Sequence, residues 1–279
     1  MKKQFLCVFT LVLLILLLFV SCSGSLTDTL LKVMDGTDTN AYIKTGIVKP
    51  STEAVDKVLD ALTTETTSVT VATTDSTVIV KIGGKNISVE VSDAGLKELI
   101  KNGGVIAPQT EEKKAQLTAS INEAISSPTS KEQLAKELSK DVTDEETVKA
   151  IQGTYALGSS ALSEVSGKDG IPDNVKTLLN KLAGECKAAA TATTGFTEAD
   201  KAQAQLIANA AASAVKASSI LASNPSNKED VLENEDVKEL LNDTLTLYNA
   251  AKIATGKVDI LASESIINEL ISSFGGNNG

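Results

Sequence analysis

The sequence contains no histidine, no tryptophan and no arginine, so all 26 of its basic residues are lysines. Histidine is the usual proton carrier near neutral pH and the commonest metal ligand in proteins. Arginine is the side chain that binds a phosphate or a carboxylate through two parallel hydrogen bonds. The composition therefore argues against histidine-based catalysis, histidine-ligated metals and arginine clamps for phosphate. A codon bias would give the same composition, but the chemical consequence would not change.

Cysteine and aromatic residues are also scarce. Of the three cysteines, Cys7 and Cys22 belong to a leader segment, which leaves Cys186 as the only thiol of the remaining chain. No disulfide bond can form within that remainder. A core must therefore be built mainly from leucine, isoleucine, valine and alanine. The aromatic residues beyond the leader are Tyr42, Tyr155, Phe196, Tyr248 and Phe274.

Negative charge dominates the sequence. Removal of Lys2 and Lys3 with the leader would lower the formal net charge from −10 to −12. A surface of this charge repels nucleic acid and anionic lipid headgroups. We therefore expect no nucleic-acid partner, and we expect any charged partner to be basic.

The leader has the pattern of an export signal. Lys2 and Lys3 precede an apolar run from Phe5 to Val20, which is at the short end of what spans a bilayer. Small polar residues follow, and no basic stop-transfer cluster comes after them. The pattern predicts a secretory signal rather than a retained transmembrane helix.

The segment Leu18-Phe19-Val20-Ser21-Cys22 resembles the lipobox of bacterial lipoproteins. It matches a relaxed, spirochaete-type form, because Phe19 stands where the common form has leucine. The resemblance implies that residues 1–21 are a signal peptide and that Cys22 becomes the first mature residue and carries acyl groups such as palmitate. It implies a lipid-anchored protein of the cell envelope, at the outer membrane or the cell surface. A cleaved signal with a coincidental cysteine, or a membrane-anchored N-terminus, stays open.

Hydrophobic patterning predicts the organisation of the rest. Residues 22–50 are expected to be the lipid anchor, a short helix and a tether. Residues 51–109 are expected to form a small α+β segment, because alternation of apolar and polar residues over 69–91 predicts an antiparallel three-stranded β-meander between two helices. Residues 110–274 are expected to form a helical bundle, and 275–279 a disordered tail. The predicted fold class is mainly α: a multi-helix bundle or array with a small meander near its N-terminal end.

Several details are expected within the bundle, where only helices are predicted. Thr129–Glu132 and Thr143–Glu146 have the spacing of capping boxes that start helices. Gly158 lies on an apolar stripe and marks either a close backbone approach or a break. Gly195 is expected to end one helix. An alanine-rich helix from Thr197 to about residue 223 is expected to be central and buried.

Most candidate chemical groups have a simpler structural interpretation. Cys186 lies on the apolar stripe of its helix without a histidine to activate it, which favours a buried cysteine over a nucleophile. Three acidic pairs suggest calcium binding or acid–base catalysis, but none has the spacing of a calcium loop. These pairs are Glu111 and Glu112, Glu145 and Glu146, and Glu233 and Asp236. The first two of them fit the first turns of helices, where carboxylates oppose the helix dipole.

The remaining candidates are a glycine turn and three aromatic residues. Gly83-Gly84-Lys85-Asn86 only loosely resembles a phosphate-binding loop and leads into a predicted strand, so a hairpin turn is favoured. Core packing is favoured over a tyrosine-lined groove for Tyr155, Tyr248 and Phe274. We therefore predict no catalytic, cofactor-binding or metal-binding residue, and Cys22 as a lipidation site.

The sequence thus predicts a lipid-anchored envelope or surface lipoprotein with a non-catalytic helical body that contacts another macromolecule. The membrane, through acylated Cys22, and an unknown protein or envelope component would be its partners. Two alternatives stay open. A periplasm-facing binding module would hold a small apolar or peptide ligand between helices. A carboxylate-based hydrolase would need two carboxylates facing each other across a cleft, at roughly 5 to 10 Å.

Overall fold

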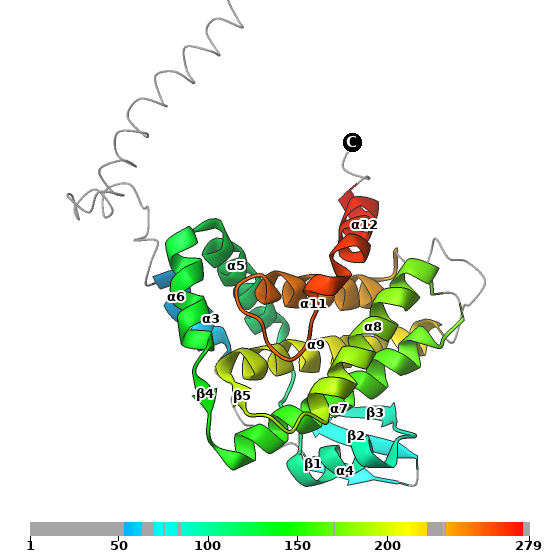
Figure 1. The fold of residues 1–279 in the computed structure, drawn as a ribbon. Coiled ribbons are helices and arrows are strands. Elements are labelled where there is room, and N and C mark those ends of the chain that lie inside the picture. The colour runs from blue at the N-terminus through cyan, green and yellow to red at the C-terminus, as the bar shows by residue number, and fades with distance from the viewer. Residues whose placement is uncertain are drawn as a thin grey trace, which may run out of the picture. The chain divides into compact units, whose positions relative to one another are not determined.

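The computed structural model describes residues 53–62, 70–74, 76–82, 85–169, 171–221, 231 and 233–275. The leader with Cys22, the predicted tether and residues 276–279 of the predicted tail lie outside the described residues. The described part is mainly helical with short antiparallel strands, which confirms the mainly α class (Figure 1). Its elements are α3 (Glu53–Leu62), β1 (Thr70–Thr73), β2 (Thr77–Ile82), β3 (Lys85–Glu90), α4 (Ala94–Gly103), α5 (Glu111–Ser126), α6 (Pro128–Leu138), β4 (Asp141–Val142), α7 (Glu145–Ser166), α8 (Asp173–Ala190), β5 (Phe196–Thr197), α9 (Glu198–Leu221), α11 (Glu235–Ala251), η1 (Leu261–Ser263) and α12 (Glu264–Gly275).

The strands near the start of the described part follow a period of two. β2 pairs antiparallel with β1 and with β3. Val78 of β2 lies opposite Val89 of β3, and both side chains are buried. Their neighbours Ile79 and Ser88 lie opposite each other on the other face, because successive residues of a strand point to opposite sides. Helix α7 contacts β3, so this apolar face joins the helical core.

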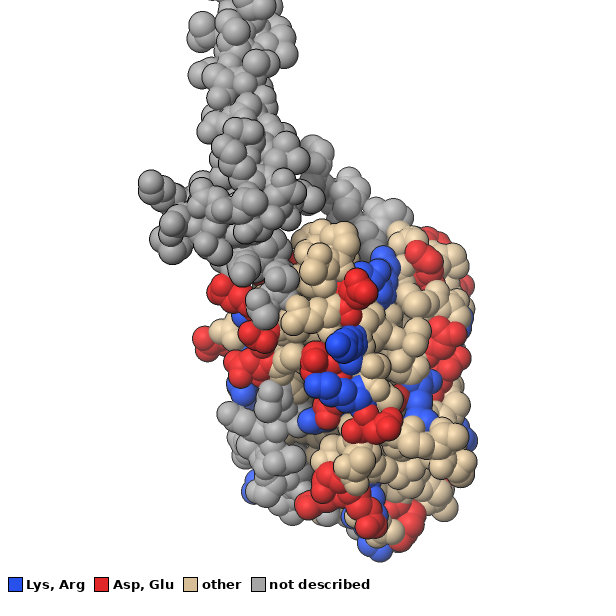
Figure 2. Space-filling model, turned by 60° about the vertical axis from the view of Figure 1, so that its left-hand side comes forward, with Lys and Arg blue, Asp and Glu red and all other residues tan. Residues whose placement is uncertain are grey.

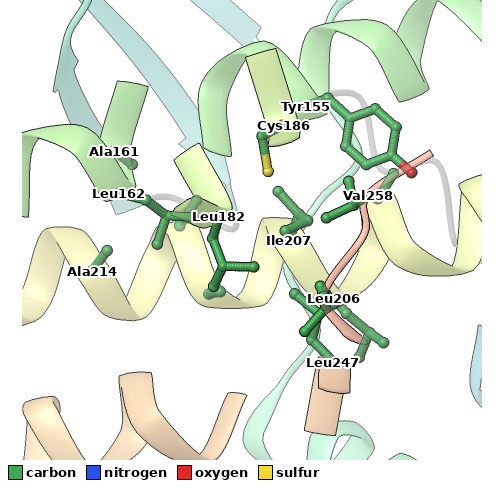
Figure 3. Close-up of a cluster of buried hydrophobic side chains, with 14 of the residues drawn as sticks. Tyr155, Ala161, Leu162, Leu182, Cys186, Leu206, Ile207, Ala214, Leu247 and Val258 are labelled. Atoms are coloured by element: carbon green, nitrogen blue, oxygen red, sulfur yellow. The ribbon is translucent and has the colours of Figure 1, made fainter. Parts of the chain in front are cut away.

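Helix α9 lies at the centre of the helical body. It packs against α7 and α11, and most of its length is buried, as predicted for the alanine-rich segment. Lys216 and Ser219 are its exposed residues among those described. Small side chains allow close helix packing on both sides. Figure 3 shows the apolar cluster where α7, α8 and α9 meet, with Val258 from the segment after α11 closing it.

Gly158 does not break its helix, because α7 runs unbroken from Glu145 to Ser166. It provides the close approach instead. A Cβ at this position would lie closer than 3.0 Å to the Ile207 side chain of α9, which real Cβ atoms do not tolerate. The absence of a side chain at Gly158 therefore sets the distance between the two helices.

Both predicted capping boxes are wrong in detail. Ser127, not Thr129, caps α6, and Pro128 begins that helix, because the fixed φ of proline suits a first turn. Asp144, not Thr143, caps α7 and accepts a hydrogen bond from a backbone N–H three residues further on, at 2.8 Å. A carboxylate satisfies the free amide as a hydroxyl would and also opposes the helix dipole.

The expectation of only helices beyond residue 110 is also wrong. β4 pairs antiparallel with β5, with Asp141 opposite Thr197 and Val142 opposite Phe196. Strands of two residues are too short to show a period in the sequence. β4 lies between α6 and α7, and β5 lies between α8 and α9. Helix α8 ends at Ala190 and not at the predicted Gly195.

The segment between α11 and η1 has no regular secondary structure. Asp200 of α9 accepts a hydrogen bond from the Lys257 N–H at 2.7 Å, and Gln203 accepts one from the Val258 N–H at 3.3 Å. The side chains of Val258 and Ile260, in the same segment, are buried in the core. Side chains of α9 thus satisfy the amides that a helix would have satisfied.

Candidate functional site

The candidate site is a groove of about 920 Å³ between α5 and α11, with Lys216 of α9 at its edge. This volume is in the range of ligand-binding clefts in proteins. Leu245, Ala115 and Ala119 are the apolar residues of its lining, and the rest is polar. The polar residues are Glu111, Lys114, Thr118, Asn122, Lys216, Glu235, Asp236, Lys238, Glu239, Asn242, Thr246 and Asn249.

Lys114 is the centre of a cluster of charges in the wall of this groove, of which Lys114 and Asp243 are the buried members. Only 10% of its side chain is exposed, and its Nζ lies 3.2 Å from Asp243 Oδ2 and 3.2 Å from Glu111 Oε1. The Nζ also donates to Glu239. Ser213 of α9 donates to the same Asp243 Oδ2 at 2.5 Å. The lysine therefore pairs with carboxylates of both helices and joins α5 to α11.

The two other lysines of the groove are also paired. Lys216 Nζ lies 3.0 Å from Glu239 Oε2 and 3.8 Å from Glu111. Lys238 Nζ lies 3.2 Å from Glu233 and 3.5 Å from Glu235. Figure 2 shows lysines in contact with acidic side chains on one face of the molecule. An anion would have to displace a carboxylate from each of these lysines before it could bind.

Within this cluster the pKa values of the two carboxyl groups, Glu239 and Asp243, are shifted in opposite directions. Burial alone would lower the pKa of Lys114, but attraction to Asp243 and the hydrogen bond to Glu239 outweigh it and raise the pKa. Burial raises the pKa of Asp243, although Lys114 and Ser213 oppose this effect. Burial would also raise the pKa of Glu239, but hydrogen bonds from Lys114 and Lys216 lower it to about 2.

Two carboxylates with pKa values pushed apart resemble an acid–base pair. The geometry argues against that role for Glu239 and Asp243. Glu239 lines the groove, whereas Asp243 is not part of the lining and faces Lys114 and Ser213 instead. Lys114 is no nucleophile, because its raised pKa keeps it protonated. The arrangement is that of an ion cluster that holds three helices together.

A second groove, of about 650 Å³, lies on the other side of α5 and is bordered by α3. Ala119 lines both grooves. The other lining residues of the second groove are mostly polar: Lys57, Asp60, Ala61, Lys113, Gln116, Ser120 and Glu123. Neither groove has the aliphatic lining that a small apolar ligand requires.

Cys186 and the predicted tyrosines lie in the core. The Cys186 side chain is fully buried, and burial raises the pKa of its thiol. Tyr155 is fully buried, and its hydroxyl donates to the Asp200 backbone carbonyl at 2.9 Å. Tyr248 is buried, and Lys252 Nζ lies 4.3 Å from the centre of its ring. These residues do not come together in a site, and the Phe274 side chain lies outside the described part.

The acidic pairs are distributed over separate helix ends. Glu111 and Glu112 begin α5, and Glu145 and Glu146 begin α7. Asp236 lies in the first turn of α11, and Glu233 precedes that helix and pairs with Lys238. Of these six residues, Glu111 and Asp236 line the groove. Gly83 and Gly84 lie outside the described residues, while Lys85 and Asn86 begin β3.

Sequence reasoning missed Lys114, Ser213 and Asp243. A signal for two of them is present. Lys114 lies one turn before Leu117 on the buried face of α5, and Asp243 lies between Leu240 and Leu247 on the stripe of α11. Opposite charges at apolar-stripe positions of two helices indicate a buried ion pair, because neither charge is tolerated there alone. Ser213 has no such signal within its alanine-rich helix.

Comparison with models of protein families, with curated proteins and with solved structures finds no match to this chain. Among the described residues, no three histidine, cysteine or acidic side chains are placed to hold a metal ion. None of the helices in that part is both long and apolar enough to cross a membrane.

Proposed function

We propose that this chain is a lipid-anchored lipoprotein of the bacterial cell envelope or surface, with a non-catalytic helical body that contacts another macromolecule. The observation that carries the proposal is the leader, in which Lys2 and Lys3, the apolar run Phe5–Val20 and Cys22 follow one another. Two or more acyl chains at Cys22 would hold the protein stably, whereas one chain holds a protein only marginally.

Features of the body support a non-catalytic role. Cys186 is buried and has a raised pKa, so a thiolate is disfavoured. The lysines of the α5–α11 groove are paired with carboxylates, and Asp243 does not face the groove. A hydrolase would need two carboxylates that both reach a substrate in one cleft.

Acyl labelling tests the anchor. Bacterial cells that express the full chain are grown with radiolabelled palmitate, and the purified protein is analysed by mass spectrometry. We expect label and a mature N-terminus at Cys22 with acyl mass, and loss of both in Cys22→Ala. A matched Cys7→Ala variant should keep the label, because Cys7 would be removed with the leader.

Protease treatment of intact cells then tests the location. A surface protein should be degraded from outside, whereas one facing the periplasm should be degraded only after the outer membrane is permeabilised. A purified chain that starts at Met1, or at any residue other than Cys22 and without acyl mass, would refute the proposed anchor.

A further inference from the structure

The α5–α11 groove has two chemically different halves. The two helices run in the same direction, because Lys114 contacts Asp243 and, one turn further, Thr118 Oγ1 lies 3.0 Å from Thr246 Oγ1. Charged residues therefore gather at the N-terminal ends of both helices, and amides and hydroxyls gather toward the C-terminal ends. The second half is lined by Thr118, Asn122, Asn242, Thr246 and Asn249.

The charged half favours a cation. Its three lysines contact Glu111, Glu233, Glu235, Glu239 and Asp243, so each positive charge is already neutralised. Asp236 also lines the groove and makes no ion pair with the described residues. Carboxylates thus exceed lysines in this half, and the formal charge of the chain, −10, has the same sign. An incoming lysine or arginine would meet an attractive field.

The amide half suits a polypeptide main chain. Each asparagine side chain offers both a donor and an acceptor, as each peptide group does. Asn122 lies on the α5 wall and is exposed, while Asn242 and Asn249 lie on the α11 wall. Because none of the described lining residues is aromatic, they offer no stacking surface of the kind that favours sugar rings or nucleobases.

We propose that this groove binds an extended polypeptide segment of a partner, with a lysine or arginine side chain against Asp236 and Glu235 and main-chain groups against Asn122, Asn242 and Asn249. The inference rests on the proposed function and gives its partner a chemical class: a basic polypeptide. The residues that contact it come from two helices already fixed by the Lys114 cluster, so the groove exists before the partner binds.

Fluorescence anisotropy with defined peptides tests this inference on the full chain in non-ionic detergent. The probes are fluorescein-labelled Gly-Ser-Lys-Lys-Ser-Gly and its two counterparts with glutamate or glutamine in place of both lysines. We expect the lysine peptide to bind most tightly and to weaken as salt is raised. Equal binding of all three peptides would overturn the proposal.

Variants then locate the binding. Asp236→Asn should weaken binding of the lysine peptide about two- to five-fold, the range for one partly exposed ion pair. Asn242→Ala should weaken it about two- to ten-fold through a lost hydrogen bond. Glu132→Gln, on the exposed surface of α6 and outside the groove, removes the same charge as Asp236→Asn and should change nothing.

The outcomes separate the groove from the anchor. Equal effects of Asp236→Asn and Glu132→Gln, or no effect of Asn242→Ala, would overturn the groove as the binding site. Unchanged thermal unfolding by circular dichroism would show that a loss of binding is local. Acyl labelling at Cys22 without selective peptide binding would refute the groove alone and leave the proposed lipoprotein intact.

Discussion

Gly158 of α7 packs directly against the Ile207 side chain of α9, with no room for a Cβ between them. Cys186 of α8 lies beside the same contact, so three helices meet there (Figure 3). The position is buried. A methyl group at residue 158 would have to push α9 away or force Ile207 out of its rotamer.

We therefore expect Gly158→Ala to lower the free energy of unfolding by about 1–3 kcal/mol, the usual cost of overpacking. Gly184→Ala in α8 is the matched control, because nothing lies within 4 Å of a Cβ at that position. It should raise the free energy of unfolding by up to about 1 kcal/mol through helix propensity. Urea denaturation measures both variants. Equal effects of the two substitutions would contradict the packing argument.

Lys114 gives the second prediction. Lys114→Met removes the cation from Glu239 and leaves Asp243, 8% exposed, as a buried charge without an ion-pair partner among the described residues. We expect a loss of about 3–5 kcal/mol in the free energy of unfolding, as for other broken buried ion pairs. Addition of Asp243→Leu to Lys114→Met should recover part of that loss, because the unpaired charge is then gone.

The control for Lys114 is Lys140→Met. Lys140 pairs with Glu137 at the surface, where 62% of the lysine side chain is exposed. Exposed ion pairs contribute little, so urea denaturation should show a much smaller change. If both lysine variants lost the same stability, the buried cluster would have no special role.

Periodicity predicted the helical elements well where it was strong. The apolar stripe that contains Cys186 and the alanine-rich segment of α9 both gave buried helices, since each pattern fits one element type over several turns. It failed where tertiary contacts decide. β5 lies where only helices were expected, because it pairs with β4, a contact across more than fifty residues that no local pattern shows.

The candidate groove was missed for a related reason. Asp243 and Lys114 are 129 residues apart, and each was an isolated charge on its own helix. Only the fold shows that α5 and α11 lie side by side. By contrast, the burial of Cys186 could be predicted, because a single apolar stripe with Leu182 contains it.

Acid unfolding gives the third prediction. Glu239 has a folded-state pKa of about 2, below the ordinary 4.5, so it stabilises the fold above pH 4.5, and this contribution is lost as the pH falls toward 2. Asp243 has a raised pKa, so its contribution has the opposite sign: it is present below pH 3.8 and lost as the pH rises through the folded-state pKa. Glu239→Gln should therefore flatten the loss of stability between pH 4.5 and 2.

Urea denaturation at a series of pH values measures this dependence. Glu112→Gln is the control, because Glu112 is exposed in the first turn of α5 and does not line the groove. It should leave the slope nearly unchanged. A Glu239→Gln protein with the same slope as the parent would show that the carboxylate is not held by Lys114 and Lys216.

The fourth prediction concerns the thiol of Cys186. In a full chain with Cys7→Ser and Cys22→Ser, Cys186 is the only cysteine. Its side chain is fully buried, and burial raises the pKa of the thiol, so neither access nor the reactive thiolate is available in the folded state. We expect a maleimide to label it in urea but not in buffer, as measured by mass spectrometry.

Gly158→Ala, which disturbs the adjacent contact with Ile207, should speed labelling in buffer, whereas Gly184→Ala should not. Rapid labelling of the folded parent would contradict the burial of this thiol between α7, α8 and α9.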